Sequence, residues 1–194
     1  PKIFSPSPLN PISPLVGANS LILQGGEKHQ EDKKLMMPYF HGGALNEYQE
    51  DIYTIITEEL LQLKFDSEQK FLMESVREIT LHVIMGVIFG VKNRLERIRL
   101  RHHINNYIDS YNAVLMFFPS TRKKFLGFGP WDRFLKTQSI LDEEIKNLIL
   151  NSSNEISLMA KLKKLYAHEI NTKNYRPIID QLKTLLIAGH ETTA

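Results

Sequence analysis

Apolar residues recur at steps of three and four along most of this chain, and that spacing limits the folds open to it. Such a stripe lies on one side of an α-helix, whereas a half-buried strand needs strict alternation. The clearest stripe runs from Tyr48 to Leu60 and predicts a helix over residues 45–63. A second helix is expected over 67–89, apolar nearly all round in its second half. Neither alternation nor an internal repeat is present, so the sequence predicts an all-α fold around one core.

Proline, glycine and capping residues set the expected limits of the helices. Five prolines fall within the first fourteen residues, so residues 1–25 are expected to form an irregular segment. Gly90 stands where a helix-ending glycine would, and Asn174 is expected to cap the last helix with Pro177 in its first turn. The remaining helices are expected over residues 27–37, 92–118, 131–150 and 157–166.

The chain is interpreted as one partial domain, irregular over 1–25 and helical over 26–194. It starts at Pro1 and stops at Ala194 inside an apolar helical pattern, so we expect a piece of a longer protein. The longest apolar stretch is shorter than the roughly 20 residues a membrane-spanning helix needs, and no signal peptide precedes it. These residues are therefore expected to be soluble and cytoplasmic, and a membrane anchor before residue 1 stays open.

Composition removes several kinds of chemistry. The sequence has no cysteine, which excludes disulfides, a cysteine nucleophile and thiolate-bound zinc, iron–sulfur or haem within these residues. The net charge of +2 gives no strong attraction to nucleic acid. One basic run, residues 92–103, is compatible with a patch for a redox partner or nucleic acid, but its interleaved apolar residues favour a solvated amphipathic helix. His82 and His168 lack partners at ligand spacing and are expected to be structural or exposed.

The last helix carries the residues with the clearest chemistry. Leu185, Ala188 and Thr192 share one face, because residues three and four apart are neighbours on a helix. Ala188 and Gly189 leave space for something bulky and flat to lie against the backbone. The Thr192 hydroxyl is placed to bond the Ala188 carbonyl, and an acid beside an alcohol, Glu191, suits a proton relay.

Two other interpretations of this segment were weighed. Small residues and threonines are also common in ordinary helix–helix packing, so spacing alone does not decide the function. A metalloprotease helix requires His-Glu-x-x-His, and the fifth position counted from His190 is Ala194, so no metal site is expected from this motif.

Taken whole, the run Ala188-Gly189-His190-Glu191-Thr192-Thr193 resembles the oxygen-activation signature of the cytochromes P450, which are haem-thiolate monooxygenases. Residues 26–41 are similar to the C helix of that family, with His29 followed four residues later by Lys33. The resemblance runs from the loop before the C helix to the middle of the I helix, less than half of a usual member. The Glu-x-x-Arg pair and the cysteine loop of the family are expected after Ala194.

The resemblance implies roles for the cofactor residues. His29 and Lys33 would donate hydrogen bonds to a haem propionate, although the family more often has Arg at the second position and Lys offers only a point charge. Ala188 and Gly189 would lie against the distal face of the haem, next to bound dioxygen. Haem b is expected in the complete protein, and only weak binding is expected from these residues alone.

The catalytic roles implied by the resemblance fall on two residues. Thr192 would hydrogen-bond the bound oxygen, and Glu191 would pass protons inward. The implied enzyme is an oxidoreductase that acts on paired donors and incorporates molecular oxygen. Its electrons would come from a ferredoxin or a reductase, and no nucleic acid partner is implied.

The substrate-contacting regions of the family correspond to the opening segment, residues 107–129 and residues 182–186. Leu185, Phe117 and Phe118 would contact an apolar small molecule such as a fatty acid, although aromatic residues at helical spacing also suit a core. The alternative function is a non-catalytic, truncated helical remnant or interaction module that lacks haem. A basic helical nucleic-acid binder has only residues 92–103 in its favour.

Overall fold

The computed structural model describes residues 10–63, 69–152 and 155–193, with side chains over 10–63, 73–152 and 155–190. Its long helices are α2 (Gly26–Met36), α3 (Gly43–Leu60), α4 (Gln69–Phe89), α5 (Arg94–Ser110), α7 (Pro130–Asn151) and α10 (Arg176–Thr193). The shorter elements are α1 (Ser13–Val16), η1 (Leu21–Leu23), η2 (Met37–Phe40), α6 (Ala113–Phe117), η3 (Pro119–Thr121), α8 (Leu158–Leu165) and α9 (Ala167–Asn171). These described ranges contain no strand, and the predicted all-α class is confirmed.

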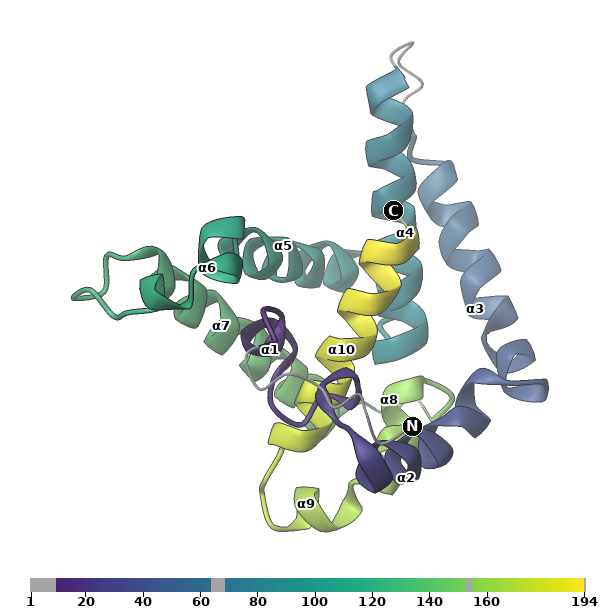
Figure 1. Ribbon diagram of the computed structural model, residues 1–194. Coiled ribbons are helices and arrows are strands. Elements are labelled where there is room, and N and C mark those ends of the chain that lie inside the picture. The colour runs from purple at the N-terminus through teal and green to yellow at the C-terminus, as the bar shows by residue number, and fades with distance from the viewer. Residues whose placement is uncertain (1–9, 64–68, 153–154, 194) are drawn as a thin grey trace.

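Helix α10 lies near the middle of the molecule and packs along α4 (Figure 1). Helix α3 also packs along α4, and α5 pairs with α7. The core lies where these helices meet, and apolar side chains from all of them except α3 are fully buried there. Those with 0% exposure include Met85, Ile104, Phe134, Leu141 and Leu182. Burial of such side chains is the main force that holds the helices together.

A glycine of α4 lies against α3. A Cβ on Gly86 would lie 2.2 Å from Cδ1 of Ile55, so a larger residue there requires the Ile55 side chain to shift. Leu81 and Phe89 are each 1% exposed, which confirms that the second half of this helix is buried. Gly90 follows with φ +70°, a conformation that favours glycine, and α4 ends there as predicted.

The opening segment is more ordered than the prolines indicate. Helix α1 and turn η1 fall inside residues 1–25, where an irregular chain was expected, while residues 1–9 lie outside the described part. Two side chains donate to carbonyls of this segment. The hydroxyl of Tyr111, the residue after α5, donates to the Pro11 carbonyl, and Gln138 Nε2 of α7 donates to the Pro14 carbonyl at 3.0 Å. These long-range bonds are invisible in the local sequence.

Local capping explains where the other predictions succeed or fail. Ser157 caps α8 by accepting from the Ala160 N–H at 3.2 Å, as its position predicts. The helix expected over 92–118 is interrupted, because the Asn112 side chain accepts from the Leu115 N–H and starts α6. Asn174 is not the cap of α10: the helix begins at Arg176, and the Tyr175 carbonyl accepts its first intrahelical bond.

The basic run over residues 92–103 has the solvated face that was expected, with Lys92 and Arg99 side chains 61% and 66% exposed, but Arg97 departs from it. Arg97 is 0% exposed and lies between two carboxylates of α3, with Nη2 2.6 Å from Glu58 Oε2 and 3.4 Å from Glu59 Oε1. Burial of a guanidinium requires such partners. Other cations of this run also pair with acids, in the pairs Lys92–Asp51, Arg94–Glu59, Arg99–Glu144 and Arg101–Glu78.

His82 is structural, as predicted, and belongs to the same buried network. Its Nδ1 lies 2.6 Å from Glu59 Oε1. Burial lowers the pKa of His82 below 6.5, against the opposing effect of Glu59. Burial alone would raise the pKa of Glu59, but hydrogen bonds and charge from His82 and Arg94 hold it below 4.5. Neutral His82 therefore donates to ionised Glu59.

Across the described residues, no helix combines the length and apolar character that crossing a bilayer requires.

Candidate functional site

The first half of α10 is fixed by a buried ionic cluster. Asp180 is 0% exposed, and its Oδ1 lies 3.2 Å from Arg176 Nε and 3.9 Å from Lys183 Nζ. Its Oδ2 accepts from the backbone N–H and the side-chain amide of Asn19, at 3.1 and 2.8 Å. Gly17 has φ +89°, and a Cβ there would lie 2.0 Å from Asp180 Oδ1. The opening segment therefore closes tightly over α10.

Lys183 is the cation at the centre of this cluster. Its side chain is 0% exposed, with Nζ 2.9 Å from Asp142 Oδ1 on α7 and 5.6 Å from the centroid of the Tyr107 ring. Burial lowers the pKa of Lys183 below 10.5, and the negative charge of Asp142 opposes that shift. Asp142 and Asp180 are the counter-ions that make burial of this ammonium tolerable.

The cluster was missed by sequence reasoning. Asp180 and Lys183 interrupt the apolar pattern of the last helix, and that interruption was the available signal. Gln181 and Thr184 add further links: Gln181 Nε2 donates to the Asn19 carbonyl at 2.8 Å, and Thr184 Oγ1 lies 2.6 Å from Ser20 Oγ. Four of the five residues at positions 180–184 are polar, and they hold α10 against neighbouring elements.

The C-terminal end of α10 is open on one side. Leu186 is fully buried and Leu185 half-buried, whereas Ala188 is exposed. Gly189 faces α4 instead of the open side, since a Cβ there would lie 3.3 Å from Cδ1 of Ile84 on α4. The two small residues of the motif therefore face different surroundings, with Gly189 against a helix and Ala188 on the open flank.

The predicted catalytic residues stand one turn further on. The backbone of Glu191 and Thr192 belongs to α10, which continues to Thr193. Their side chains lie outside the described part of the structure. The roles of Glu191 and Thr192 therefore stay predictions.

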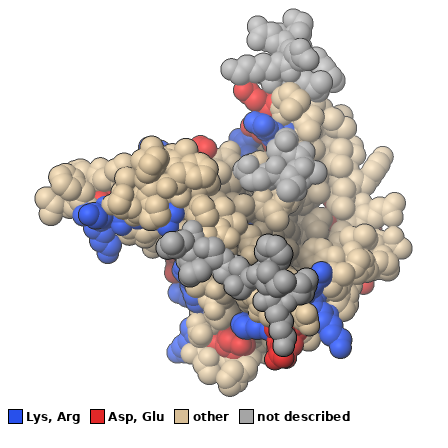
Figure 2. All heavy atoms as spheres, in the orientation of Figure 1, with Lys and Arg blue, Asp and Glu red and all other residues tan. Residues whose placement is uncertain are grey.

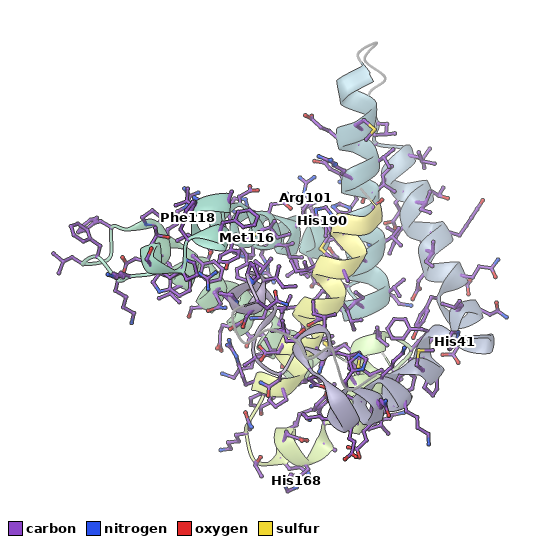
Figure 3. The ribbon with its side chains drawn as sticks, in the orientation of Figure 1. His41, Arg101, Met116, Phe118, His168 and His190 are labelled. Carbon is purple, nitrogen blue, oxygen red and sulfur yellow. The ribbon has the colours of Figure 1, made fainter. Side chains whose placement is uncertain are left out.

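His190 lines a polar pocket of about 290 Å³ between α10, α4 and α5. The α4 side of the pocket contributes Glu74, Arg77 and Glu78, and the α5 side contributes Arg101, Asn105 and Asp109. Figure 3 shows His190 and Arg101 close together at the end of α10. Sequence patterns did not connect these α4 and α5 residues with His190, because they are far from the motif along the chain.

The predicted propionate ligands lie on α2, away from this end of α10 (Figure 1). His29 is half-buried and Lys33 exposed. Within the described residues, neither side chain makes a hydrogen bond or ion pair, unlike Lys28, whose Nζ lies 3.4 Å from Asp32 Oδ2. Helix α10 packs against α1, α4, α7, α8 and η1, so the structure does not bring His29 and Lys33 to Ala188.

The predicted substrate residues are also divided. Leu185 packs against the core on α10, whereas Phe117 and Phe118 are 65% and 61% exposed at the end of α6. Phe118 and His190 are well separated in Figure 3. The α6–α7 protrusion shows largely uncharged surface with basic side chains along one edge (Figure 2). Leu185 thus lies three residues from Ala188 on the same helix, and the two phenylalanines lie on a separate part of the chain.

A larger cavity than the one beside His190 lies elsewhere. It has a volume of about 880 Å³ and is lined by the α4–α5 connection, α5, the end of α7 and the segment before α8. None of the predicted site residues lines it. Cavity size therefore does not identify the site in this chain.

Comparison with known proteins agrees with the all-α fold and the motif on α10. The family model described as Cytochrome P450 matches residues 7–194. The chain therefore belongs to the cytochrome P450 family.

Individual relatives show the same family. The chain is 28% identical over 187 residues to cytochrome P450 135A1 of Mycobacterium tuberculosis, covering 93% of this chain and 41% of that protein. It is 29% identical over 208 residues to cytochrome P450 138 of Mycobacterium bovis, covering 100% of this chain and 46% of that protein. The chain thus spans less than half the length of these relatives.

A solved structure shares the fold. Retinoic acid bound cyanobacterial CYP120A1 matches with a TM-score of 0.72 and 24% identity, over 97% of this chain and 42% of that one. At that identity the match concerns the arrangement of helices alone. It agrees with an incomplete all-α portion of the P450 fold.

Proposed function

We propose that this chain forms part of a haem-dependent monooxygenase, in which the open flank of α10 covers one face of the haem. The observation that carries the proposal is the division at Ala188 and Gly189. A small, exposed residue leaves a flat group room to approach the helix, while its neighbour packs against α4 and keeps the helix in position. Family membership makes haem the group expected there.

The donor set of this chain fits the acidic side groups of a haem. His29 and Lys33 stand four residues apart on α2, so they share one helix face, and neither side chain has a partner within the described residues. Both can donate to a carboxylate, and hydrogen bonds to a charged group are stronger than neutral ones. The sequence offers no thiolate, so an axial cysteine would come from outside these residues.

When bound, the haem supplies the chemistry that activates dioxygen. The residues of this chain act around it. Ala188 leaves space beside the helix, and Leu185 bounds that space with an apolar surface. Glu191 holds a proton on its carboxyl group, and Thr192 passes it from its hydroxyl toward the reacting oxygen. Gly189 sets how closely α10 sits on α4.

An apolar substrate suits the surfaces available. Leu185, three residues before Ala188 on α10, would contact it from the edge of the core, and a fatty-acid-like molecule would match that apolar character. Phe117 and Phe118 would contact the substrate only if the α6–α7 protrusion moved toward α10. Electrons would come from a ferredoxin or a reductase, as the family implies.

The first test uses the full-length protein that contains this chain. We expect about one haem per protein and a red-shifted band with carbon monoxide after reduction, which reports a thiolate ligand. His29→Ala and Lys33→Ala should each lower haem retention, and Lys34→Ala, an exposed lysine next to Lys33, should not. A full-length protein without haem would favour the non-catalytic alternative.

The second test addresses the acid–alcohol pair. Thr192→Ala should keep haem binding but lower the product formed per electron consumed, because the hydroxyl that passes the proton is gone. Thr193→Ala makes the same substitution at the neighbouring threonine and serves as the matched control. Unchanged coupling in Thr192→Ala would show that Thr192 does not have this role.

A further inference from the structure

Helix α2, which carries His29 and Lys33, buries little of its own surface. All eleven of its residues are described, and Met36 at the C-terminal end is the buried one. Its main packing is against η1 and η2, the two elements that flank it along the chain. On another side, a cavity of about 350 Å³ lies between α2 and Tyr166, at the junction of α8 and α9. The direction of α2 therefore depends on what holds its two ends.

The N-terminal end of α2 is held through η1. The Leu21 N–H of η1 donates to Gln181 Oε1 on α10 at 3.1 Å. Gln24 Nε2, just before α2, donates to the Asn19 carbonyl at 3.0 Å. The Asn19 side chain donates in turn to Asp180 of the buried cluster. These bonds connect the start of α2 to the anchored half of α10.

The C-terminal end of α2 is held by a lysine of α8, which lies beside the connection from α2 to α3 (Figure 1). Lys161 Nζ lies 5.8 Å from the centroid of the Tyr39 ring in η2 and 4.6 Å from that of the Tyr48 ring in α3. It also donates to the Tyr48 hydroxyl at 2.9 Å and to Glu47 Oε2 at 2.7 Å. One ammonium group of α8 thus contacts both the turn after α2 and the first half of α3.

These contacts are strengthened because the ammonium group is largely removed from water. The Lys161 side chain is 14% exposed, and Tyr48 is 4% exposed. Burial alone would lower the pKa of Lys161, but its hydrogen bonds to Glu47 and Tyr48 outweigh burial and hold the pKa above 10.5. Hydrogen bonds to a charged group are stronger than neutral ones, and contact of a cation with an aromatic face gains from desolvation. Lys161 is therefore charged at neutral pH.

We propose that Lys161 is a positioning residue for the haem contacts of α2. By holding η2 and α3 against α8, it sets the direction in which α2 presents His29 and Lys33. Lys161 contacts η2 and α3, so its effect on those two side chains is indirect. This inference rests on the proposed function, because the direction of α2 affects haem only if His29 and Lys33 bind it.

The main test measures haem dissociation from the full-length, haem-loaded protein into an excess of a haem-acceptor protein. Lys161→Met keeps the length of the side chain and removes its charge. We expect dissociation about tenfold faster, at the lower end of the roughly 10- to 100-fold losses found when residues that orient metal ligands are removed.

A double-mutant cycle distinguishes positioning from an unrelated structural effect. In a protein that already carries His29→Ala and Lys33→Ala, Lys161→Met should change haem dissociation by less than about twofold, because the side chains it positions are gone. An equal acceleration in both backgrounds would overturn the inference, since Lys161 would then not act through His29 and Lys33.

Matched variants test the chemistry of the contact. Lys164→Met changes an exposed lysine on the same helix and should match the wild type. Lys161→Arg should retain most of the haem affinity, because a guanidinium group also binds carboxylates and aromatic faces. Tyr39→Leu removes the ring in η2 and leaves the bonds to α3, so it should accelerate dissociation less than Lys161→Met. It also provides the test if Lys161→Met does not fold, and wild-type dissociation in Tyr39→Leu would contradict the inference.

Hydrogen exchange of the full-length protein gives a readout that does not depend on turnover. Lys161→Met should speed exchange of the amides of residues 26–41 and leave those of α5 as in the wild type. Faster exchange in both segments would show a general loss of stability, and unchanged exchange in residues 26–41 would show that Lys161 does not hold α2. Either result would refute the inference. A wild type without haem would instead refute the proposed function, so haem content tells the two failures apart.

Discussion

The two halves of α10 differ in burial and in the polar contacts that they make. From Ile178 to Leu186 the helix is almost fully buried, and its charged side chains are paired with α7 and with the opening segment. From Ile187 to His190 burial decreases, with Ala188 exposed and His190 on a polar pocket. The difference shows that a small, exposed residue can stand on a helix whose other half is anchored in the core.

The largest expected effect comes from breaking the buried half. Asp180→Ala leaves Lys183 buried with one counter-ion fewer and removes two hydrogen bonds from Asn19. Loss of one partner of a buried ion pair costs about 3–5 kcal/mol, so the urea midpoint should fall sharply. Glu143→Ala on the exposed face of α7 is the control and should change it by less than about 0.5 kcal/mol. Equal effects would show that the cluster does not anchor α10.

The second largest expected effect distinguishes Gly189 from its neighbour Ala188. Gly189→Leu forces a side chain against Ile84, and overpacking costs about 1–3 kcal/mol, only partly offset by better helix propensity. Ala188→Leu meets no such contact and should leave the stability of the haem-free protein within about 0.5 kcal/mol. It should instead lower haem content. If Ala188→Leu lowered the free energy of unfolding more than Gly189→Leu in urea, Ala188 and not Gly189 would be the residue that packs against α4.

A pH effect follows from Lys183. Because burial keeps its pKa below the value of 10.5 expected in the unfolded chain, the unfolded chain binds more protons just below that pH. Stability contributed by this residue should therefore rise as the pH increases toward 10.5. Lys183→Met should remove that rise from the difference in free energy of unfolding between variant and wild type. The same substitution at exposed Lys164 should not, and parallel curves for Lys183→Met and wild type would refute this assignment.

The smallest expected effect concerns an exposed lysine–aspartate pair, which contrasts with the buried pair of Lys183 and Asp180. Lys28 and Asp32 on α2 lie 3.4 Å apart, but the lysine side chain is 68% exposed. Solvent and salt screen such a pair, so Lys28→Ala should cost less than about 0.5 kcal/mol in urea unfolding. A loss as large as that of Asp180→Ala would show that exposure does not explain the contrast between the two pairs.

Much of the fold was predictable because its signals are local. The stripe over residues 45–63, the Ser157 cap and the glycine after Phe89 each act within a few residues of the chain, and the structure confirms them. Arg97 shows where local reasoning fails. Its charge suggested solvent, but Glu58 and Glu59 are 39 and 38 residues away and bury it. Periodicity carries no information about partners at that separation.

In the candidate site, too, the features that depend on local sequence were predictable and those that depend on distant residues were not. The run from Ala188 to Thr193 is contiguous, so its residues and helix were predictable, and the family match supports that interpretation. The separate orientations of Ala188 and Gly189 were not predictable, because they depend on Ile84 of α4. The pocket beside His190 likewise needs α4 and α5 to be placed in space.

The most direct test of the account is the environment of the Ala188 methyl group. In the full-length ferric protein with ¹³C-labelled alanine methyl groups, iron near the open flank of α10 should strongly broaden or shift the Ala188 signal. The exposed Ala167 on α9 provides the reference. A displaced Ala188 signal beside a sharp Ala167 signal is predicted, and two equally sharp signals from a haem-loaded protein would contradict the claim that this flank faces the haem.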